Sequence, residues 1–235
     1  MSIPWFHVTS LPAAGDSIVL DRDEAKHALG VRRLGAGDGV TVFDGRGGIA
    51  EATITGERSR DGGPVIRVVS VRRQERRGAD VVVAVAPPKG DRLSTMLDML
   101  GQLGASKVVP LDTQHGVVDA DGINRARAER ILLESAKQSR GAWVPELGSA
   151  MSVREFVASA VAEGREVLIA QPGGVAAQCA SGRAALVVGP EGGFSVQEVA
   201  DAVAAGARAV DLGPAILRVE TAAVCLAAQL RARPA

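Results

Sequence analysis

Residues 187–195, with the sequence VVGPEGGFS, constrain the fold of this chain most strongly. The apolar run from Ala185 to Val188 is typical of a strand buried in a parallel sheet. Glycines at 189, 192 and 193 allow a sharp turn or the close approach of a ligand. Ser195 and Glu198 have the spacing of a capping box, which predicts a helix start. Together they predict a ligand site at the carboxyl end of a sheet.

A second stretch, residues 209–222, has the same organisation. A short strand at 209–212 leads through Gly213-Pro214 into a helix that runs to Leu230. Two such turns, one helix apart, are expected side by side in a parallel sheet.

The whole of residues 78–235 alternates between strand and helix patterns. The other expected strands are 81–86, 107–110 and 166–170, and the other expected helices are 93–103, 124–139 and 153–163. This alternation predicts an α/β domain with a mostly parallel sheet.

Residues 1–77 have a different pattern of short strands. The expected strands are 17–20, 39–43, 49–54 and 65–69, interrupted by one helical segment from Asp23 to Leu29. Asp44-Gly45 and Gly47-Gly48 indicate a hairpin turn. The pattern predicts a small β-barrel, which ends near Arg77 in a charged strip.

Composition excludes several classes of protein. The 27 basic residues balance the 27 acidic ones, so no overall basic field indicates a nucleic-acid binder. No apolar run approaches the roughly 20 residues of a membrane span, and residues 1–10 lack a signal-peptide pattern. Cys179 and Cys225 are far apart, which predicts buried structural thiols and no metal site. We expect a cytoplasmic protein.

Common catalytic and nucleotide-binding motifs are missing from the sequence. Neither the G-x-G-x-x-G spacing nor a P-loop occurs, and H-E-x-x-H, G-x-S-x-G and metal-spaced Cys-His pairs are also lacking. What remains is a ligand recognised by backbone groups and apolar contacts. Adenosine-type cofactors without a phosphate chain fit that description.

The two loops carry a family resemblance. Gly189 to Ser195 with Glu198, then Leu212-Gly213-Pro214 and Ile216 to Ala222, resemble the small-subunit ribosomal RNA uracil-N3 methyltransferase family, part of the knotted SPOUT class. The resemblance covers nearly the whole chain. His27, 31–33, 37–38 and 42–45 resemble the PUA-like RNA-binding barrel of that family, and residues 89–93, 103–105, 110–111, 134, 138–139 and 144–146 resemble the start of its catalytic domain.

The resemblance implies an S-adenosylmethionine-dependent enzyme of ribosome biogenesis that methylates N3 of a uridine in 16S ribosomal RNA of the small subunit. It also implies a C-terminal trefoil knot in residues 78–235 and a homodimer with its active site at the subunit interface. The alanines of the last helix could pack across that interface or in the core of one chain.

The resemblance further implies roles for particular residues. The expected cofactor-binding residues are Ile169, Ala170, Val188, Gly189, Pro190, Glu191, Gly192, Gly193, Leu212, Gly213, Ile216, Leu217 and Thr221. The expected RNA contacts are Arg22, His27, Arg32, Arg33, Lys89, Arg92 and His115. Arg218 and Glu220 are the candidate catalytic residues.

Some of these roles have alternatives. Arg218 could orient the uracil, hold a phosphate, or form a salt bridge with Glu220 or Glu191. Glu191 could bind polar groups of the cofactor or close its own turn, and His27 and Arg32 could be ordinary surface groups. The sequence identifies no general base.

Several positions depart from the family pattern. Ala215 stands where an arginine is usual, Met99 and Gln102 where Lys and Glu are frequent, His115 where an arginine is common, and Trp143 where the residue is often basic. These departures leave open two other hypotheses: an RNA-binding assembly factor with weakened catalysis, and a methyltransferase for another RNA position such as a ribose 2′-hydroxyl. The cofactor loops are intact, so cofactor binding is expected to survive.

Overall fold

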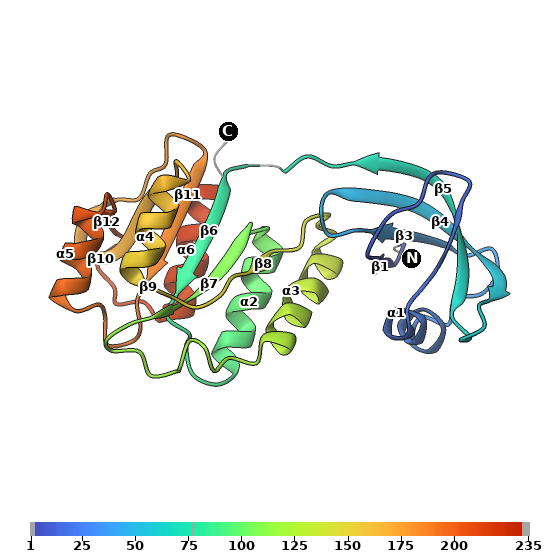
Figure 1. The fold of residues 1–235 in the computed structure, drawn as a ribbon, viewed down its shortest axis with the longest axis horizontal. Helices are drawn as coiled ribbons and strands as arrows, with labels where there is room; N and C mark the ends of the chain where they lie inside the picture. Colours follow the sequence, from blue (N-terminus) through green and yellow to red (C-terminus); the bar gives the residue numbers. More distant parts are fainter. Residues whose placement is uncertain (1–2, 77, 232–235) are drawn as a thin grey trace. The chain divides into compact units, whose positions relative to one another are not determined.

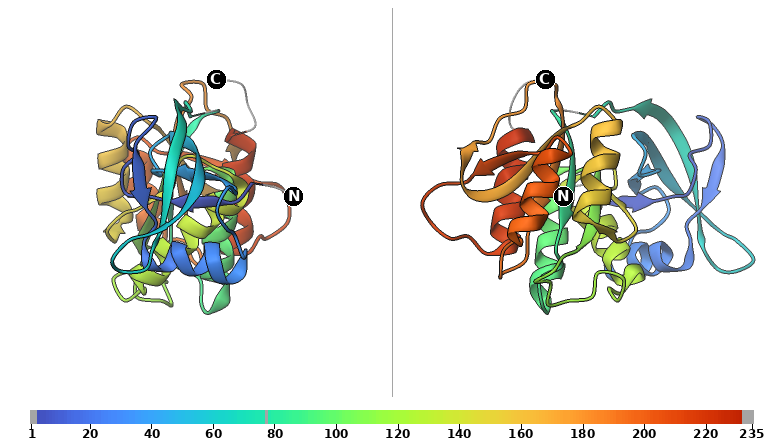
Figure 2. Two further views of the ribbon diagram at one scale, coloured as in Figure 1. Left: turned by 90° about the vertical axis from the view of Figure 1, so that its right-hand side faces the viewer. Right: turned by 60° about the vertical axis from the view of Figure 1, so that its left-hand side comes forward.

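The computed structural model describes residues 3–76 and 78–231 (Figures 1 and 2). They form two compact units: unit 1 comprises the described parts of 1–76 together with 136–144, and unit 2 comprises those of 77–135 and 145–235. The boundary expected at Arg77 falls on a residue outside the described ranges and stays a prediction. Segment 136–144 was expected in the second domain. It belongs to unit 1 because its backbone bonds to the turn at 45–47, through Val144 N to Gly45 O and Gly47 N to Ala142 O.

Unit 1 is built on a five-stranded sheet in the order β1-β3-β4-β5-β2. The strands are β1 (Trp5–His7), β2 (Ser17–Val19), β3 (Gly39–Phe43), β4 (Gly48–Arg58) and β5 (Pro64–Arg73). All neighbours are antiparallel except β1 and β3. The four predicted strands are confirmed, whereas β1 was missed because three residues carry too little alternation to predict a strand.

One short helix covers the core of unit 1. Helix α1 (Arg22–Lys26) begins at Asp21, whose side chain accepts a hydrogen bond from Glu24 N, and continues into the π-helical turn η1 (His27–Val31). The helix predicted at 23–29 is therefore confirmed in position. The core under it includes Phe6, Leu20, Ala28, Val42 and Ile66.

Unit 1 also buries an ion pair. Lys137 Nζ lies 2.8 Å from Glu24 Oε1, and the two side chains are only 6% and 7% exposed. The backbone N–H of His7 donates to the same carboxylate oxygen at 3.2 Å. Buried charges persist only when they are paired in this way.

Unit 2 contains the parallel sheet predicted by the alternation of strands and helices. Its order is β12-β10-β11-β6-β7-β8, with β9 paired to β7, and every pairing is parallel. The strands are β6 (Asp80–Val85), β7 (Lys107–Asp112), β8 (Glu146–Leu147), β9 (Met151–Ser152), β10 (Glu166–Ala176), β11 (Arg183–Val188) and β12 (Arg208–Asp211). Strands β10, β11 and β12 lie side by side in this sheet, which is consistent with the expected trefoil knot.

Helices cover both faces of this sheet (Figures 1 and 2). The helices are α2 (Asp91–Leu103), α3 (Arg125–Ser139, whose residues from 136 onward belong to unit 1), α4 (Val153–Ala162), α5 (Val196–Ala204) and α6 (Val219–Arg231). Helices α4 and α5 pack together on one face, while α6 packs against α2, β6 and β11 on the other. The capping box of Ser195 and Glu198 is confirmed at the start of α5. Ala222, Ala223 and Ala227 of α6 are buried within the chain.

The cysteines differ from expectation. Both are free, but Cys179 is only partly buried and Cys225 is exposed, so the prediction of buried thiols was wrong. Cys225 shares the solvent-facing side of α6 with Thr221 and Gln229, at spacings of four residues. Among the described residues, no helix combines the length and apolar character that crossing a membrane requires.

Candidate cofactor site

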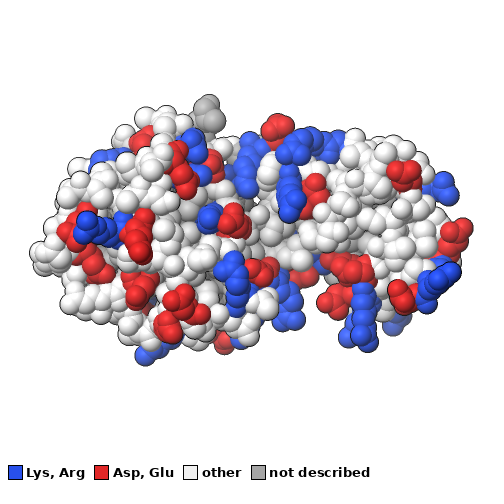
Figure 3. Space-filling view, viewed as in Figure 1, with Lys and Arg blue, Asp and Glu red and all other residues white. Residues whose placement is uncertain are grey.

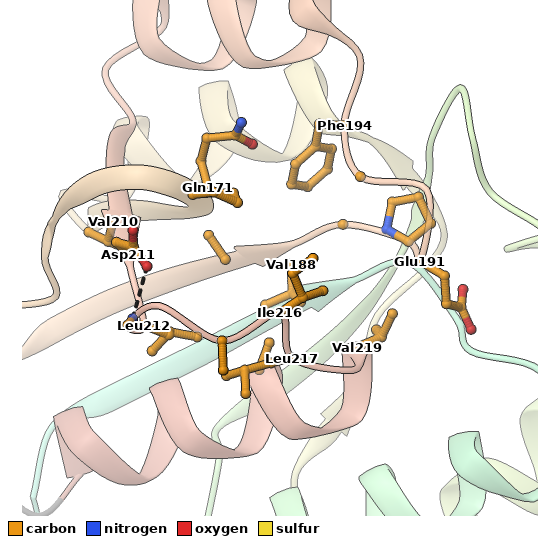
Figure 4. Close-up of a pocket in the computed structure, with 18 of the residues that line it drawn as sticks. Gln171, Val188, Glu191, Phe194, Val210, Asp211, Leu212, Ile216, Leu217 and Val219 are labelled. Atoms are coloured by element: carbon orange, nitrogen blue, oxygen red, sulfur yellow. Dashed lines mark hydrogen bonds between the residues drawn. The ribbon is translucent and has the colours of Figure 1, made fainter.

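A pocket lies at the carboxyl ends of three adjacent strands, β10, β11 and β12 (Figure 4). Its volume is about 220 Å³. Parallel strands present their carboxyl ends at one edge, where the loops that follow them can enclose a ligand. In Figure 4 the Phe194 ring lies on one side of this pocket and Leu212 and Leu217 lie on the other.

Most of the predicted cofactor-binding residues line this pocket. They are Ala170, Val188, Gly189, Pro190, Glu191, Gly193, Leu212, Gly213, Ile216 and Leu217. Three others lie elsewhere: Ile169 is fully buried in the core, Gly192 faces His115, and Thr221 is exposed on α6. Ile169 points away because side chains of a strand alternate between its two faces, and Thr221 because successive residues of a helix point about 100° apart.

The structure adds lining residues that the sequence interpretation missed. These are Gln171, Pro172, Phe194, Val210, Asp211, Pro214, Ala215, Val219 and Ala222. Gln171 and Pro172 were missed because β10 continues to Ala176 through a shift in its pairing with β12, rather than ending at 170. The Pro-Gly-Gly run at 172–174 could have indicated this irregular wall.

Asp211 ties two walls of the pocket together. Its carboxylate accepts hydrogen bonds from Gly173 N at 2.7 Å and Gly213 N at 2.9 Å, the second drawn as a dashed line in Figure 4. These backbone donors lower the pKa of Asp211 below its usual 3.8, and the N–H of Gly173 has the largest effect. The charged carboxylate thus holds the loop after β12 against the bulge of β10.

This arrangement predicts a pH dependence of stability. A lowered folded-state pKa gives stabilisation that is present above the unfolded pKa near 3.8 and is lost as pH falls through the folded value. We expect wild-type protein to melt at a higher temperature than Asp211→Asn at pH 7, with a difference that shrinks toward pH 3. Thermal melts of both proteins at each pH test this. An equal difference at both pH values would contradict the role of the charge.

Gly174 lies where β10 passes closest to β12. A Cβ at this position would lie 2.7 Å from Ala209 C, Val210 C and Val210 N, and backbone atoms cannot move aside cheaply. We expect Gly174→Ala to lower the free energy of unfolding by about 1–3 kcal/mol, as overpacking does. Urea unfolding followed by circular dichroism measures this. Gly30→Ala is the control, because nothing lies within 4 Å of its added Cβ, and an equal loss there would contradict the prediction.

The glycine-rich loop at 189–193 is braced from outside the pocket. Arg92 Nη2 lies 2.7 Å from Glu191 Oε1, and each side chain is 34% exposed. Glu191 thus turns its carboxylate away from the pocket centre (Figure 4). It pairs with Arg92, whereas its expected roles were binding the cofactor or closing its own turn. The ring of His115 bonds to Gly193 O at 3.1 Å through Nδ1. Arg92 and His115, expected as RNA contacts, therefore also position this loop.

The two candidate catalytic residues lie at the start of α6. Arg218 is exposed, follows the lining residue Leu217, and forms no ion pair with any described residue, so the suggested salt bridge to Glu220 or Glu191 is absent there. Glu220 is 9% exposed, and its Oε2 has no hydrogen-bond partner within the described ranges. Neither side chain lines the pocket, so their roles stay predictions.

The remaining candidate RNA contacts are divided between the units. In unit 1, Arg22, Arg32 and Arg33 are exposed, and the half-buried His27 ring packs edge-on against Phe6 at 5.8 Å. Arg22 lines a separate hollow of about 550 Å³ between α1 and the β4–β5 turn. Lys89 in unit 2 is exposed. The exposed positions of the three arginines and Lys89 suit RNA contact, and these roles stay predictions.

Comparison with known proteins identifies the family. The family model described as an RNA methyltransferase domain matches residues 75–231, and that described as an RNA methyltransferase PUA domain matches residues 20–62. The chain belongs to the RNA methyltransferase family. This RNA methyltransferase is 33% identical to the ribosomal RNA small subunit methyltransferase E of Mycobacterium bovis, over 93% of this chain and 87% of that protein. Against the protein of the same name from Synechocystis the identity is 28%, over 92% of this chain and 73% of the relative.

A solved relative has the same fold. The ribosomal RNA small subunit methyltransferase E from Neisseria gonorrhoeae, crystallised with bound S-adenosyl methionine, has a TM-score of 0.88 and 25% identity, over 97% of this chain and 96% of that one. The likeness confirms the expected fold, a PUA-like N-terminal part and a parallel-sheet methyltransferase part.

The pocket of this RNA methyltransferase fits such a cofactor. Its walls are apolar at Val188, Leu212 and Leu217, and glycine-rich loops leave backbone groups accessible. A Cβ at Gly189 would lie 3.0 Å from the Phe194 ring, so a larger residue here would press on that ring and this wall favours glycine. Ile216 lines the pocket yet is 99% exposed. An exposed apolar side chain at a pocket is typical of a surface that a ligand or partner covers.

Proposed function

We propose that this RNA methyltransferase transfers a methyl group from S-adenosylmethionine to N3 of a uridine in 16S ribosomal RNA of the small subunit, in the cytoplasm. The observation that carries the proposal is the pocket at three adjacent strand ends, enclosed by loops 189–193 and 212–217. Its location within the matched domain, and the names of the relatives, support the substrate class.

The chain would hold the cofactor mainly through shape and backbone. Val188, Leu212 and Leu217 offer the apolar walls, and the loops at 189–193 and 212–217 offer amides and carbonyls. S-adenosylmethionine supplies a sulfonium methyl group, which is already electrophilic. The protein therefore has to align the acceptor atom and exclude water, and alignment alone can supply much of the acceleration.

The acceptor base must enter without a pairing partner. N3 lies on the Watson–Crick edge of uracil, so the target has to be unpaired or flipped out of a helix. Arg218 is exposed immediately after Leu217, where its guanidinium can hold a carbonyl oxygen of uracil or a neighbouring phosphate. As N3 loses its proton, negative charge spreads to the uracil oxygens, and a fixed guanidinium stabilises that charge.

A homodimer is part of the proposal. The fully exposed Ile216 at the pocket supports a second surface covering the site once cofactor and RNA are bound. A pocket open on one side admits water, so a partner subunit could complete its enclosure. Light scattering on the purified protein gives the mass in solution directly, and a monomer would remove this part of the proposal.

One departure from the family pattern favours a second candidate. Ala215 lines the pocket with a small, uncharged side chain where the family usually has an arginine. Gln102 bears less on chemistry, because it is exposed on α2 and its amide donates to Asp98 of the same helix. A lost charge at 215 favours methylation of another RNA position or a weakened, assembly-type role.

A methyl-transfer assay separates these functions. Purified protein, labelled S-adenosylmethionine and unmodified small ribosomal subunits are incubated, and the nucleosides are resolved by mass spectrometry. We expect 3-methyluridine. A methyl on ribose would instead support another RNA target, and cofactor binding without any methylated nucleoside would support an assembly role.

A further inference from the structure

Two arginines of unit 1 lie over the ring of one tryptophan, and a third is joined to it through the backbone. The guanidinium carbons of Arg76 and Arg73 lie 4.4 Å and 5.4 Å from the centre of the Trp143 ring, and Arg46 pairs with Trp143 through a β-bridge. Positive groups at this distance are attracted to the face of an indole. These four residues, Arg46, Arg73, Arg76 and Trp143, are called the Arg–Trp surface below.

The tryptophan ring is held in a fixed position. Its Nε1 donates to Gln74 O at 2.9 Å, next to Arg73, the last residue of β5. Gly47, with φ of 96°, lies directly against the ring, where a Cβ would be 2.5 Å from Trp143 Cζ2. A ring fixed by its neighbours can orient the guanidinium groups that stack on it before any ligand arrives.

The positive charges of Arg46 and Arg73 are available to a ligand. Arg46 and Arg73 are exposed, and across the described ranges neither forms an ion pair with a carboxylate. The nearby carboxylate of Asp44 is engaged with backbone, accepting from Arg46 N at 2.7 Å and Gly48 N at 2.9 Å through Oδ1. In Figure 3, Lys and Arg side chains gather where β5 ends.

A guanidinium stacked on a ring keeps the N–H groups at its edge free to donate. Those donors form a planar fork that matches the oxygens of a phosphate. The chain as a whole has no net charge, so a local group of stacked arginines is unusual against that background. Arginines interleaved with an aromatic ring are typical of surfaces that follow a nucleic-acid backbone.

We propose that the Arg–Trp surface binds the phosphate backbone of the RNA substrate. The proposal rests on the proposed function in naming that RNA. It assigns Trp143 to positioning two guanidinium groups, rather than to contact with the methylated base. These contacts would raise affinity without selecting sequence, because phosphates are the same at every nucleotide.

The test is binding of a 16S ribosomal RNA transcript over a series of KCl concentrations. In the double variant Arg46→Gln, Arg73→Gln, affinity should fall at least about tenfold, and the salt slope should decrease by about 1.4–1.8, which is 0.7–0.9 per lost phosphate contact. Trp143→Leu should lower affinity with a smaller change in slope, because the charges remain. Trp143→Phe, which keeps an aromatic ring, should retain most of the RNA affinity that Trp143→Leu loses.

Arg67→Gln is the matched control. Arg67 is an exposed arginine of the same strand, about 20 Å along it from Arg73 at 3.3 Å per residue. We expect its affinity to stay within twofold of wild type. Equal losses in the control and the double variant, or no loss in the double variant, would overturn the proposal.

Two further measurements separate this proposal from the proposed function. The double variant should bind S-adenosylmethionine as wild type does, because the pocket lies in unit 2. If the wild type produces no 3-methyluridine and the double variant binds RNA more weakly than the wild type, the proposed reaction fails and the Arg–Trp surface stands. If wild type methylates and the double variant binds RNA equally well, the reaction stands and the surface is refuted.

Discussion

Replacing Arg218 with alanine should slow methyl transfer by about 10²–10³-fold, the loss seen when one donor to a developing negative charge is removed. The side chain is exposed next to the pocket residue Leu217 and has no ion-pair partner among the described residues. Its removal therefore disturbs no packing. The single-turnover rate with saturating S-adenosylmethionine and unmodified small subunits measures the effect.

Cofactor affinity is the control for Arg218. Isothermal titration with S-adenosylmethionine should give the same dissociation constant for Arg218→Ala and wild type, because the side chain does not line the pocket. Arg218→Lys should recover part of the rate, since it restores charge without the planar fork. An unchanged rate in Arg218→Ala, or a loss confined to cofactor affinity, would exclude a role in handling the base.

The largest effect on stability is expected at the buried ion pair of unit 1. Lys137→Met leaves the Glu24 carboxylate 7% exposed and without its cation, which should lower the free energy of unfolding by about 3–5 kcal/mol. Both tryptophans of the chain, Trp5 and Trp143, lie in unit 1, so urea unfolding followed by tryptophan fluorescence reports on this unit.

Two variants show whether the pairing itself is responsible. Lys26→Met makes the same substitution at an exposed lysine of unit 1, and we expect a change within about 0.5 kcal/mol. The double variant Glu24→Gln, Lys137→Met removes both charges yet keeps an acceptor for His7 N, so it should regain most of the lost stability. No regain would mean that the methionine fails to pack, rather than that a lone charge is costly.

The sequence predicted the parts of this structure that local pattern determines. Val81 to Ala86 and Ala185 to Val188 are apolar runs, and both form strands of the parallel sheet. The capping box at Ser195 fixes where α5 begins. Strands β1, β8 and β9 were missed, because two or three residues gain their stability from neighbours in space rather than from their own periodicity.

Long-range features of the site could not be predicted in this way. Asp211 bonds to Gly173 across 38 residues, and no spacing rule connects them. Arg92 and Glu191 looked like separate RNA and cofactor contacts until their 2.7 Å pairing was seen. Trp143 was interpreted as a lost charge, whereas two arginines lie over its ring.

The assignment of segment 136–144 to unit 1 affects how the protein can fold during its synthesis. The first 76 residues leave the ribosome without Lys137, so the carboxylate of Glu24 has no cation to accompany its burial. The missing segment follows roughly 70 residues later, a delay of about 3–14 s at 5–20 residues per second. Until then the nascent N-terminal part lacks the partner of its buried carboxylate, so unit 1 is completed only after much of unit 2 has been translated.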